Sequence, residues 1–283
     1  MTATFEPDNP WRGIPAFLAA VTALAGLGLA AGGTAGAFLA TELAGTTSVA
    51  GLPVALHLAG SALGALLVSH QAGLGHRGRG LALGLLIGAV GAATVLFAAQ
   101  RGSLPVMLLG STLLGSANSS IFLIRYAAAQ AMAEGSPGRA LGVVFLATAF
   151  GAVASPLLLG PSDSAARAMG LPGLGGLYLV ALCAFSCSAL LLAGGSAPRV
   201  PLFGRAAHVL TSGVRHARGG VRLVAALRTR TTLVALSALA GTNFVMVGIM
   251  TITPVHLTQH GTGHGAVGFL VALHVVSMFA PAP

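Results

Sequence analysis

Long apolar segments constrain this chain more than any other feature. Eight such segments lie at 15–40, 48–69, 80–100, 104–131, 138–160, 173–194, 232–255 and 265–282. About 20 mostly apolar residues are enough for a helix to cross a bilayer. Only 7% of the 283 residues are charged, whereas about 25% are charged in a soluble domain. We therefore expect an all-α integral membrane protein.

The positions of the arginines predict how the segments are oriented. All 14 basic residues are arginine, and with the N-terminus inside the cell, eleven of them fall on the cytoplasmic side. Arg101 and Arg167 fall on the opposite side, and Arg125 lies within the fourth segment. Cytoplasmic loops of membrane proteins collect arginine, so we expect a cytoplasmic N-terminus. Because the arginines lie mainly between apolar segments, they indicate topology rather than nucleic-acid binding.

An arginine-rich connector divides the chain into three parts. We expect a six-helix transmembrane bundle at 1–194, a basic cytoplasmic linker at 195–231 and a second, partial bundle of two helices at 232–283. Residues 209–227 of the linker are predicted to form an amphipathic helix on the inner leaflet; a flexible charged linker is the alternative. The last apolar segment has no polar flank, and we expect the chain to be truncated after its eighth helix.

Arg125 is the most informative single residue. An ionisable side chain within a spanning helix is costly and usually faces a cavity or a partner. Asn118 and Phe122 lie on nearly the same face of the helix, because seven and three residues separate them from Arg125. We expect this face to line a water-filled pathway, with snorkelling of Arg125 toward the cytoplasmic surface as the alternative.

Other polar residues in the apolar segments are candidates for a transport pathway. Glu42 lies at the outer end of the first helix, just beyond the segment at 15–40, and His57 lies near the outer third of the second segment. Either is a candidate proton-binding group, with an interfacial role for Glu42 and a structural role for His57 as the alternatives. In the seventh segment, Asn243, Met246 and Met250 share a face. Flexible methionines beside an amide suit a permissive binding surface, and ordinary helix packing explains them equally well.

Three histidines follow one another at intervals of four residues. His256, His260 and His264 would form a metal-binding face on one continuous helix, but glycines interrupt that helix and no carboxylate lies nearby. We expect a polar, pH-sensitive external loop and neither a metal nor a cofactor. No nucleophile elbow, phosphate-binding loop or pair of catalytic carboxylates is evident, so we do not expect an enzyme.

The fifth segment combines small residues with a proline. Ala147, Gly151 and Ser155 are spaced i, i+4, i+8 and form one face on which another helix can approach closely. Pro156 removes a backbone donor and is expected to kink the helix in its outer half. We interpret this stretch as a flexible contact between the two bundles.

Several motifs in the chain resemble those of the major facilitator superfamily of membrane transporters. The loop after the second segment, "VSHQAGLGHR", keeps Gly75 and Arg77 of the family's G-x-x-x-D-R-x-G-R-R motif and adds Arg79, but lacks its aspartate. Arg125 matches the arginine of the fourth-helix motif R-x-x-Q-G. The fifth-helix antiporter motif is matched by the following positions: Gly142, Gly151, Ser155, Pro156 and Gly160.

This resemblance implies a multi-pass transporter of the bacterial inner membrane. A complete member has two six-helix bundles that rock about a substrate site at the midplane. The antiporter motif implies a proton-coupled exporter of small molecules, with Arg125 acting on proton coupling. Its implied partners are a small-molecule substrate, protons and the lipid bilayer, with no nucleic acid. The alternatives are a non-transporting truncated fragment, a membrane scaffold and a histidine-dependent metal protein.

Overall fold

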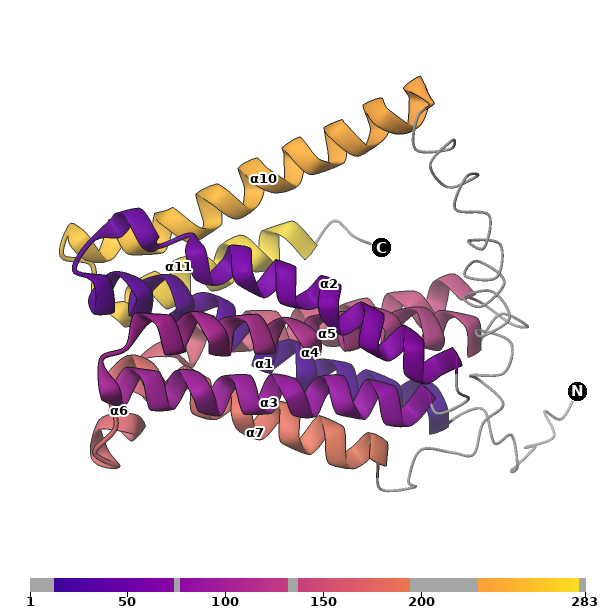
Figure 1. The fold of residues 1–283 in the computed structure, drawn as a ribbon, viewed down its shortest axis with the longest axis horizontal. Helices are drawn as coiled ribbons and strands as arrows, with labels where there is room; N and C mark the ends of the chain where they lie inside the picture. The colour runs from indigo at the N-terminus through magenta and orange to yellow at the C-terminus, as the bar shows by residue number, and fades with distance from the viewer. Residues whose placement is uncertain (1–12, 74–76, 132–136, 194–228, 280–283) are drawn as a thin grey trace, which may run out of the picture.

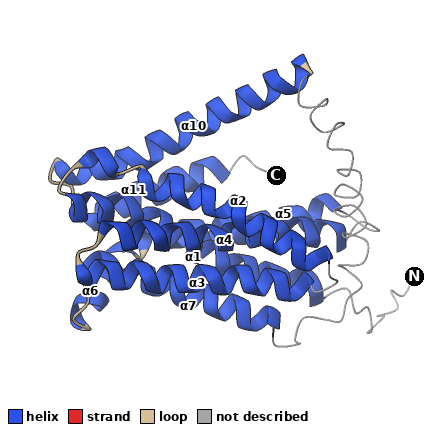
Figure 2. Ribbon diagram, in the orientation of Figure 1, coloured by secondary structure: helices blue, strands red, loops and turns tan. Residues whose placement is uncertain are grey.

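The computed structural model describes residues 13–73, 77–131, 137–193 and 229–279. Helices account for nearly all of these residues, and no strand occurs among them (Figure 2). The longer helices are α1 (Gly13–Ala44), α2 (Leu52–Gly73), α3 (Arg77–Arg101), α4 (Leu104–Ala131), α5 (Pro137–Leu157), α6 (Leu159–Ala168), α7 (Gly176–Ala193), α10 (Arg230–Gln259) and α11 (His264–Phe279). Two short 3₁₀ turns, η1 (Thr47–Val49) and η2 (Gly173–Gly175), precede α2 and α7.

The described helices confirm the expected all-α membrane protein. Six of them (α1, α2, α3, α4, α7 and α10) are long and apolar enough to cross a bilayer. The bent pair α5–α6 makes a seventh span if it is counted as one. The eighth apolar segment forms α11, which is shorter than the other candidate spans. The predicted surface helix at 209–227 lies outside the described residues.

The helices run alongside one another, and the described connectors gather at one end of the molecule (Figure 1). This end, which we call the loop end, contains residues 45–51, 102–103, 169–175 and 260–263. Each of these connectors follows a helix that the sequence predicts to run outward. The alternation of the helices therefore agrees with the predicted topology.

Helix α4 packs between α2 and α3 with little space between the backbones. A Cβ atom added at Gly64 of α2 would lie 2.6 Å from the Ser116 Cα, and one added at Gly91 of α3 would lie 2.6 Å from the Leu114 nitrogen. The Ser116 hydroxyl donates to the Gly84 carbonyl of α3 at 2.8 Å. Small residues allow this approach, which gives van der Waals contact where lipid provides no hydrophobic driving force.

A bend separates α5 from α6. The two helix axes differ by 57° at Leu158, two residues after the buried Pro156. Proline lacks the N–H that would bond to the carbonyl four residues earlier, and its ring clashes with that carbonyl. The kink predicted in the outer half of the fifth segment is confirmed.

We predict that Gly91→Val lowers the stability of the bundle, because the added side chain meets the α4 backbone. Overpacking of this kind costs about 1–3 kcal/mol. The matched control is Gly142→Val, since a Cβ added at Gly142 has no neighbour within 4 Å. Reversible unfolding in mixed micelles would measure both free energies. Equal stability of the two variants would contradict the close α3–α4 contact.

Candidate functional site

The polar residues of α4 are mostly buried against its neighbours. Asn118 is 8% exposed, and its Nδ2 donates to the Ser61 Oγ of α2 at 3.2 Å. Phe122, one turn further along, is 47% exposed. Asn118 therefore lies between α4 and α2, while Phe122 faces outward. The Arg125 backbone continues α4, but its side chain lies outside the described residues, so the shared pathway face of these three residues stays a prediction.

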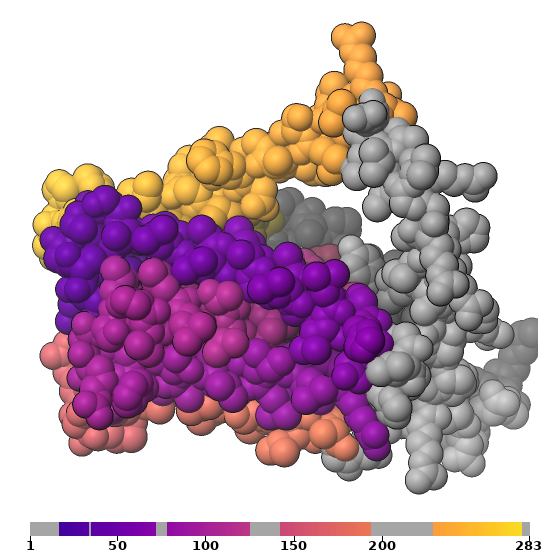
Figure 3. All heavy atoms as spheres, viewed as in Figure 1, coloured from indigo at the N-terminus to yellow at the C-terminus, as the bar shows by residue number. Residues whose placement is uncertain are grey.

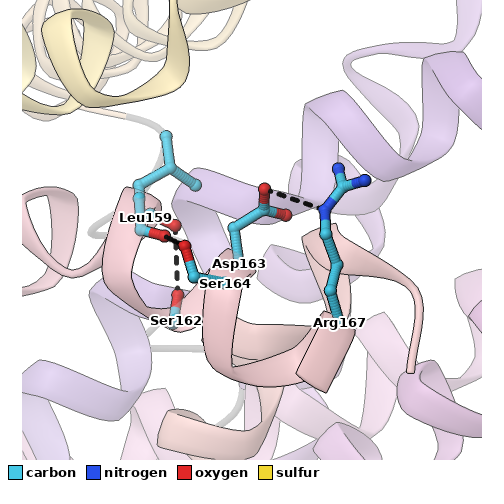
Figure 4. A network of polar contacts seen from close by, with 6 residues as sticks. Leu159, Ser162, Asp163, Ser164 and Arg167 are labelled. Atoms are coloured by element: carbon cyan, nitrogen blue, oxygen red, sulfur yellow. Dashed lines mark hydrogen bonds and ion pairs between the residues drawn. The ribbon is translucent and has the colours of Figure 1, made fainter. Parts of the chain in front are cut away.

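A wide cavity of about 760 Å³ opens at the loop end, where the end of α1 meets α6, η2 and the α10–α11 turn. The exposed Glu42 contributes to its wall from α1. Arg167 contributes from α6, and its Nε donates to the Asp163 Oδ2 at 3.3 Å. Figure 4 shows this pair beside the hydroxyls of Ser162 and Ser164. The remaining lining residues are Phe38, Thr41, Gly45, Thr46, Thr47, Gly173, Leu174, Gln259 and His264.

A second, narrow cavity of about 60 Å³ lies between α1, α2 and α4. His57 of α2 lines it and is half-buried. The facing wall is made by glycines of α1, and Ser111 and Leu114 of α4 complete it. The sequence analysis identified His57 but not these walls. The glycine-rich stretch "AAGGTAGA" at 30–37 was the signal in the sequence, because glycine leaves space beside a helix.

The predicted pathway residues of α10 lie on a part of the helix that is largely unburied. Asn243 is exposed, Met246 is 40% exposed, and Met250 is half-buried. The buried residues of α10 are Pro254 and Val255, near its loop end. The substrate-pathway role of the three side chains stays a prediction.

Helix α11 meets the bent region of α5 and α6. A Cβ atom added at Gly268 would overlap the carbonyl of Pro156, and one added at Gly160 would lie 3.9 Å from the Cα of Gly265. Two helices that are distant in sequence therefore touch through glycines at the bend. Pro156 and Gly160, both residues of the predicted motif, lie at this contact.

Gly151 makes its close contact elsewhere. A Cβ atom added there would overlap the Ala23 carbonyl and lie 2.6 Å from the Leu27 nitrogen, both on α1. The expectation that this glycine approaches the second bundle is thus corrected: it packs within the first bundle, because α1 and α5 lie side by side. Ser155 is fully buried, with no hydrogen-bond partner for its Oγ among the described residues, whereas the position of Gly142 is open.

The expected histidine loop is corrected to a short turn, because His256 lies in the last turn of α10, His260 caps that helix and His264 begins α11. The three histidines make two separate contacts. The rings of His256 and His260 lie 4.2 Å apart between centroids, and the His260 Nδ1 lies 2.9 Å from the His256 carbonyl oxygen. His264 packs on Phe38 of α1, with ring centroids 5.7 Å apart. In the described part of the chain, no group of three His, Cys, Asp or Glu side chains is placed to hold a metal ion.

The predicted cytoplasmic loop motif is only partly visible. Gly75 lies outside the described residues, and Arg77 begins α3, although its side chain is not described. Arg79 is exposed on the first turn of α3. The inter-bundle role of these three residues stays a prediction.

These features define a multi-pass helical membrane protein whose described helices pack closely at glycines and include one bent pair.

Comparison with known proteins identifies the class more closely. No family model matches the chain. The uncharacterized MFS-type transporter YddS of Bacillus subtilis (strain 168) is 33% identical over 266 residues, which cover 91% of this chain and 59% of the relative. The uncharacterized MFS-type transporter YdeG of the same organism is 32% identical over 259 residues, covering 90% of this chain and 60% of the relative.

The expected resemblance to the major facilitator superfamily is therefore confirmed: the aligned part of the chain is homologous to MFS-type transporters. The chain spans about three-fifths of the length of these curated relatives. Both relatives are named as transporters rather than enzymes, in agreement with the sequence analysis.

We predict a measurable but small coupling between Asn118 and Ser61. Hydrogen bonds between membrane helices contribute about 0.6 kcal/mol on average. A double-mutant cycle with Asn118→Ala and Ser61→Ala, followed by reversible unfolding in mixed micelles, would measure it. Additive effects of the two substitutions would contradict the hydrogen bond. Ser277→Ala is a suitable control for the loss of a hydroxyl, because Ser277 bonds only within its own helix.

Proposed function

We propose that this chain forms part of a secondary active transporter that exports small molecules in exchange for protons. The homology to MFS-type transporters supports the transporter class. The fifth-helix motif supports export, because the resemblance associates it with exporters. The resemblance to the family supports a bacterial inner-membrane location, and the arginine distribution supports a cytoplasmic N-terminus and a cytoplasmic linker between the helix groups.

The observation that most supports this proposal is the way α10 and α11 contact the first seven helices. Their described contacts gather at the loop end, where His264 packs on Phe38 and Gly268 meets Pro156. Toward its N-terminal end, α10 diverges from the bundle (Figure 1), and its most apolar stretch is not buried. Figure 3 shows α10, in orange, standing out from the upper edge of the molecule.

This arrangement suits alternating access. A transporter that rocks between two states needs its helix groups closed at one end and separated at the other. With the N-terminus inside, the loop end would be external, and closure at this end supports our proposal of an inward-facing state. The contact of α11 with α5 and α6, at the 57° bend, is the one that would open when the helix groups rock to the opposite state.

The pathway is assigned from the sequence and from this geometry. Asn118, Phe122, Asn243, Met246 and Met250 are the proposed contacts for the substrate, and Arg125 is the proposed residue that acts on proton coupling. Glu42 at the outer cavity is a second candidate for proton exchange. A non-transporting fragment or a membrane scaffold is the alternative function, since the chain spans about three-fifths of its relatives' length.

We predict that Arg125→Ala uncouples transport from protons. Respiring inside-out vesicles that contain the full chain would be given ethidium, a lipophilic cation, while ethidium uptake and proton efflux are recorded. We expect at least a tenfold loss of proton efflux per ethidium molecule, because the charge that acts on the proton site is removed.

The control for this experiment is Arg101→Ala. Arg101 lies at the loop end and stacks on the Phe97 ring, with its guanidinium carbon 5.2 Å from the ring centroid. This variant should keep the coupling of the unmodified chain. Unchanged coupling in Arg125→Ala would refute the assigned role, and a chain that moves neither ethidium nor protons would favour the fragment or scaffold.

A further inference from the structure

The narrow cavity beside His57 exists because one of its walls lacks side chains. Gly32, Gly33 and Gly36 of α1 form that wall. A Cβ atom added at Gly33 would have no neighbour within 4 Å, and one added at Gly36 would lie 3.4 Å from the Pro53 Cβ of α2. Larger residues at these positions would fill the space that His57 now faces.

The His57 imidazole has no hydrogen bond to any described residue, although it lies between packed helices. Ser111, on the opposite wall, donates its hydroxyl proton to the Met107 carbonyl at 3.0 Å, so its oxygen remains available to accept a bond. A cavity of about 60 Å³ holds about two water molecules, since each occupies about 30 Å³ in the liquid. Water in this space would have His57 and Ser111 as its polar side-chain partners, since the other lining residues are glycine or apolar.

Among the titratable groups near this cavity, His57 is the one that lines it. From α7, Tyr178 donates its hydroxyl to the Gly32 carbonyl at 3.3 Å. On α1, Glu42 faces the wider cavity at the loop end. Helix α4 contributes Ser111 and Leu114, and the Arg101 guanidinium of α3 stacks on Phe97. No described carboxylate lines the narrow cavity, so a proton on His57 depends on water for its stabilisation.

We propose that His57, in the glycine-walled cavity between α1, α2 and α4, is the site at which this protein takes up and releases a proton during transport. Water in this cavity carries the proton to and from the imidazole. The role of His57 in proton coupling rests on the proposed proton-driven export. The presence of water beside His57 does not depend on that proposal.

The first arm of the test measures the cavity without any transport. Hydrogen–deuterium exchange at the imidazole C2 position, followed by mass spectrometry, reports how water and protons reach each histidine. In the full chain in lipid nanodiscs, Gly33→Leu should slow exchange at His57 at least threefold and leave His256 and His260 unchanged. The matched control is Gly142→Leu, which adds the same side chain at an open position of α5.

The second arm measures coupling in inside-out vesicles with ethidium as the probe. The pH dependence of ethidium-driven proton efflux should flatten to less than twofold between pH 6 and pH 8 in His57→Asn. The control His274→Asn alters an exposed histidine of α11 and should keep the original profile. Asparagine keeps a polar side chain in the cavity but does not titrate in this range.

The two arms separate the possible failures. Unchanged His57 exchange in Gly33→Leu would overturn the hydrated cavity, and an unchanged pH profile in His57→Asn would overturn the coupling role. If the unmodified chain moves no ethidium, the proposed exporter function and the coupling role both fail, while the exchange arm still decides whether His57 faces accessible water.

Discussion

The structure depends on backbone contact between helices at glycine. Inside a bilayer, burying an apolar side chain against protein gains little over burying it in lipid, so helix association relies on close van der Waals packing and on hydrogen bonds between helices. Gly64 and Gly91 bring α2 and α3 against α4, Gly151 brings α5 against α1, and Gly268 brings α11 against Pro156. The same absence of side chains leaves the cavity at His57 between α1 and α2.

These contacts distinguish rigid parts of the molecule from a part suited to motion. Around α4, glycines on both sides and the Ser116–Gly84 hydrogen bond hold three helices together. At the loop end, α11 touches α5 and α6 beside a 57° bend and touches α1 through the Phe38–His264 ring contact. A small, glycine-lined contact beside a bend can re-form at a different angle more easily than the dense packing around α4.

The sequence predicted the helices and the bend well, because both follow from local chemistry. Apolar length locates α1 to α4 and α10, and the missing N–H of Pro156 predicts the kink between α5 and α6. The sequence could not predict in the same way which helix packs against each face of another helix. The spacing of Ala147, Gly151 and Ser155 shows that a helix can approach, but not that the partner at Gly151 is α1. Likewise, the spacing of Asn118 and Phe122 suggested one shared face, while Asn118 bonds to Ser61 of α2.

The most direct test of the account is a reversible lock at the loop end. The lock is a pair of cysteines, Gly160→Cys and Gly265→Cys, in a chain whose own Cys183 and Cys187 are replaced by serine. A Cβ atom at residue 160 lies 3.9 Å from the Cα of residue 265, so the two thiols can meet. We expect oxidation to form this disulfide in the full chain and to stop proton-coupled ethidium movement. A reductant should then break the disulfide and restore transport. Full transport with the disulfide formed would contradict the claim that the helix groups separate at the loop end.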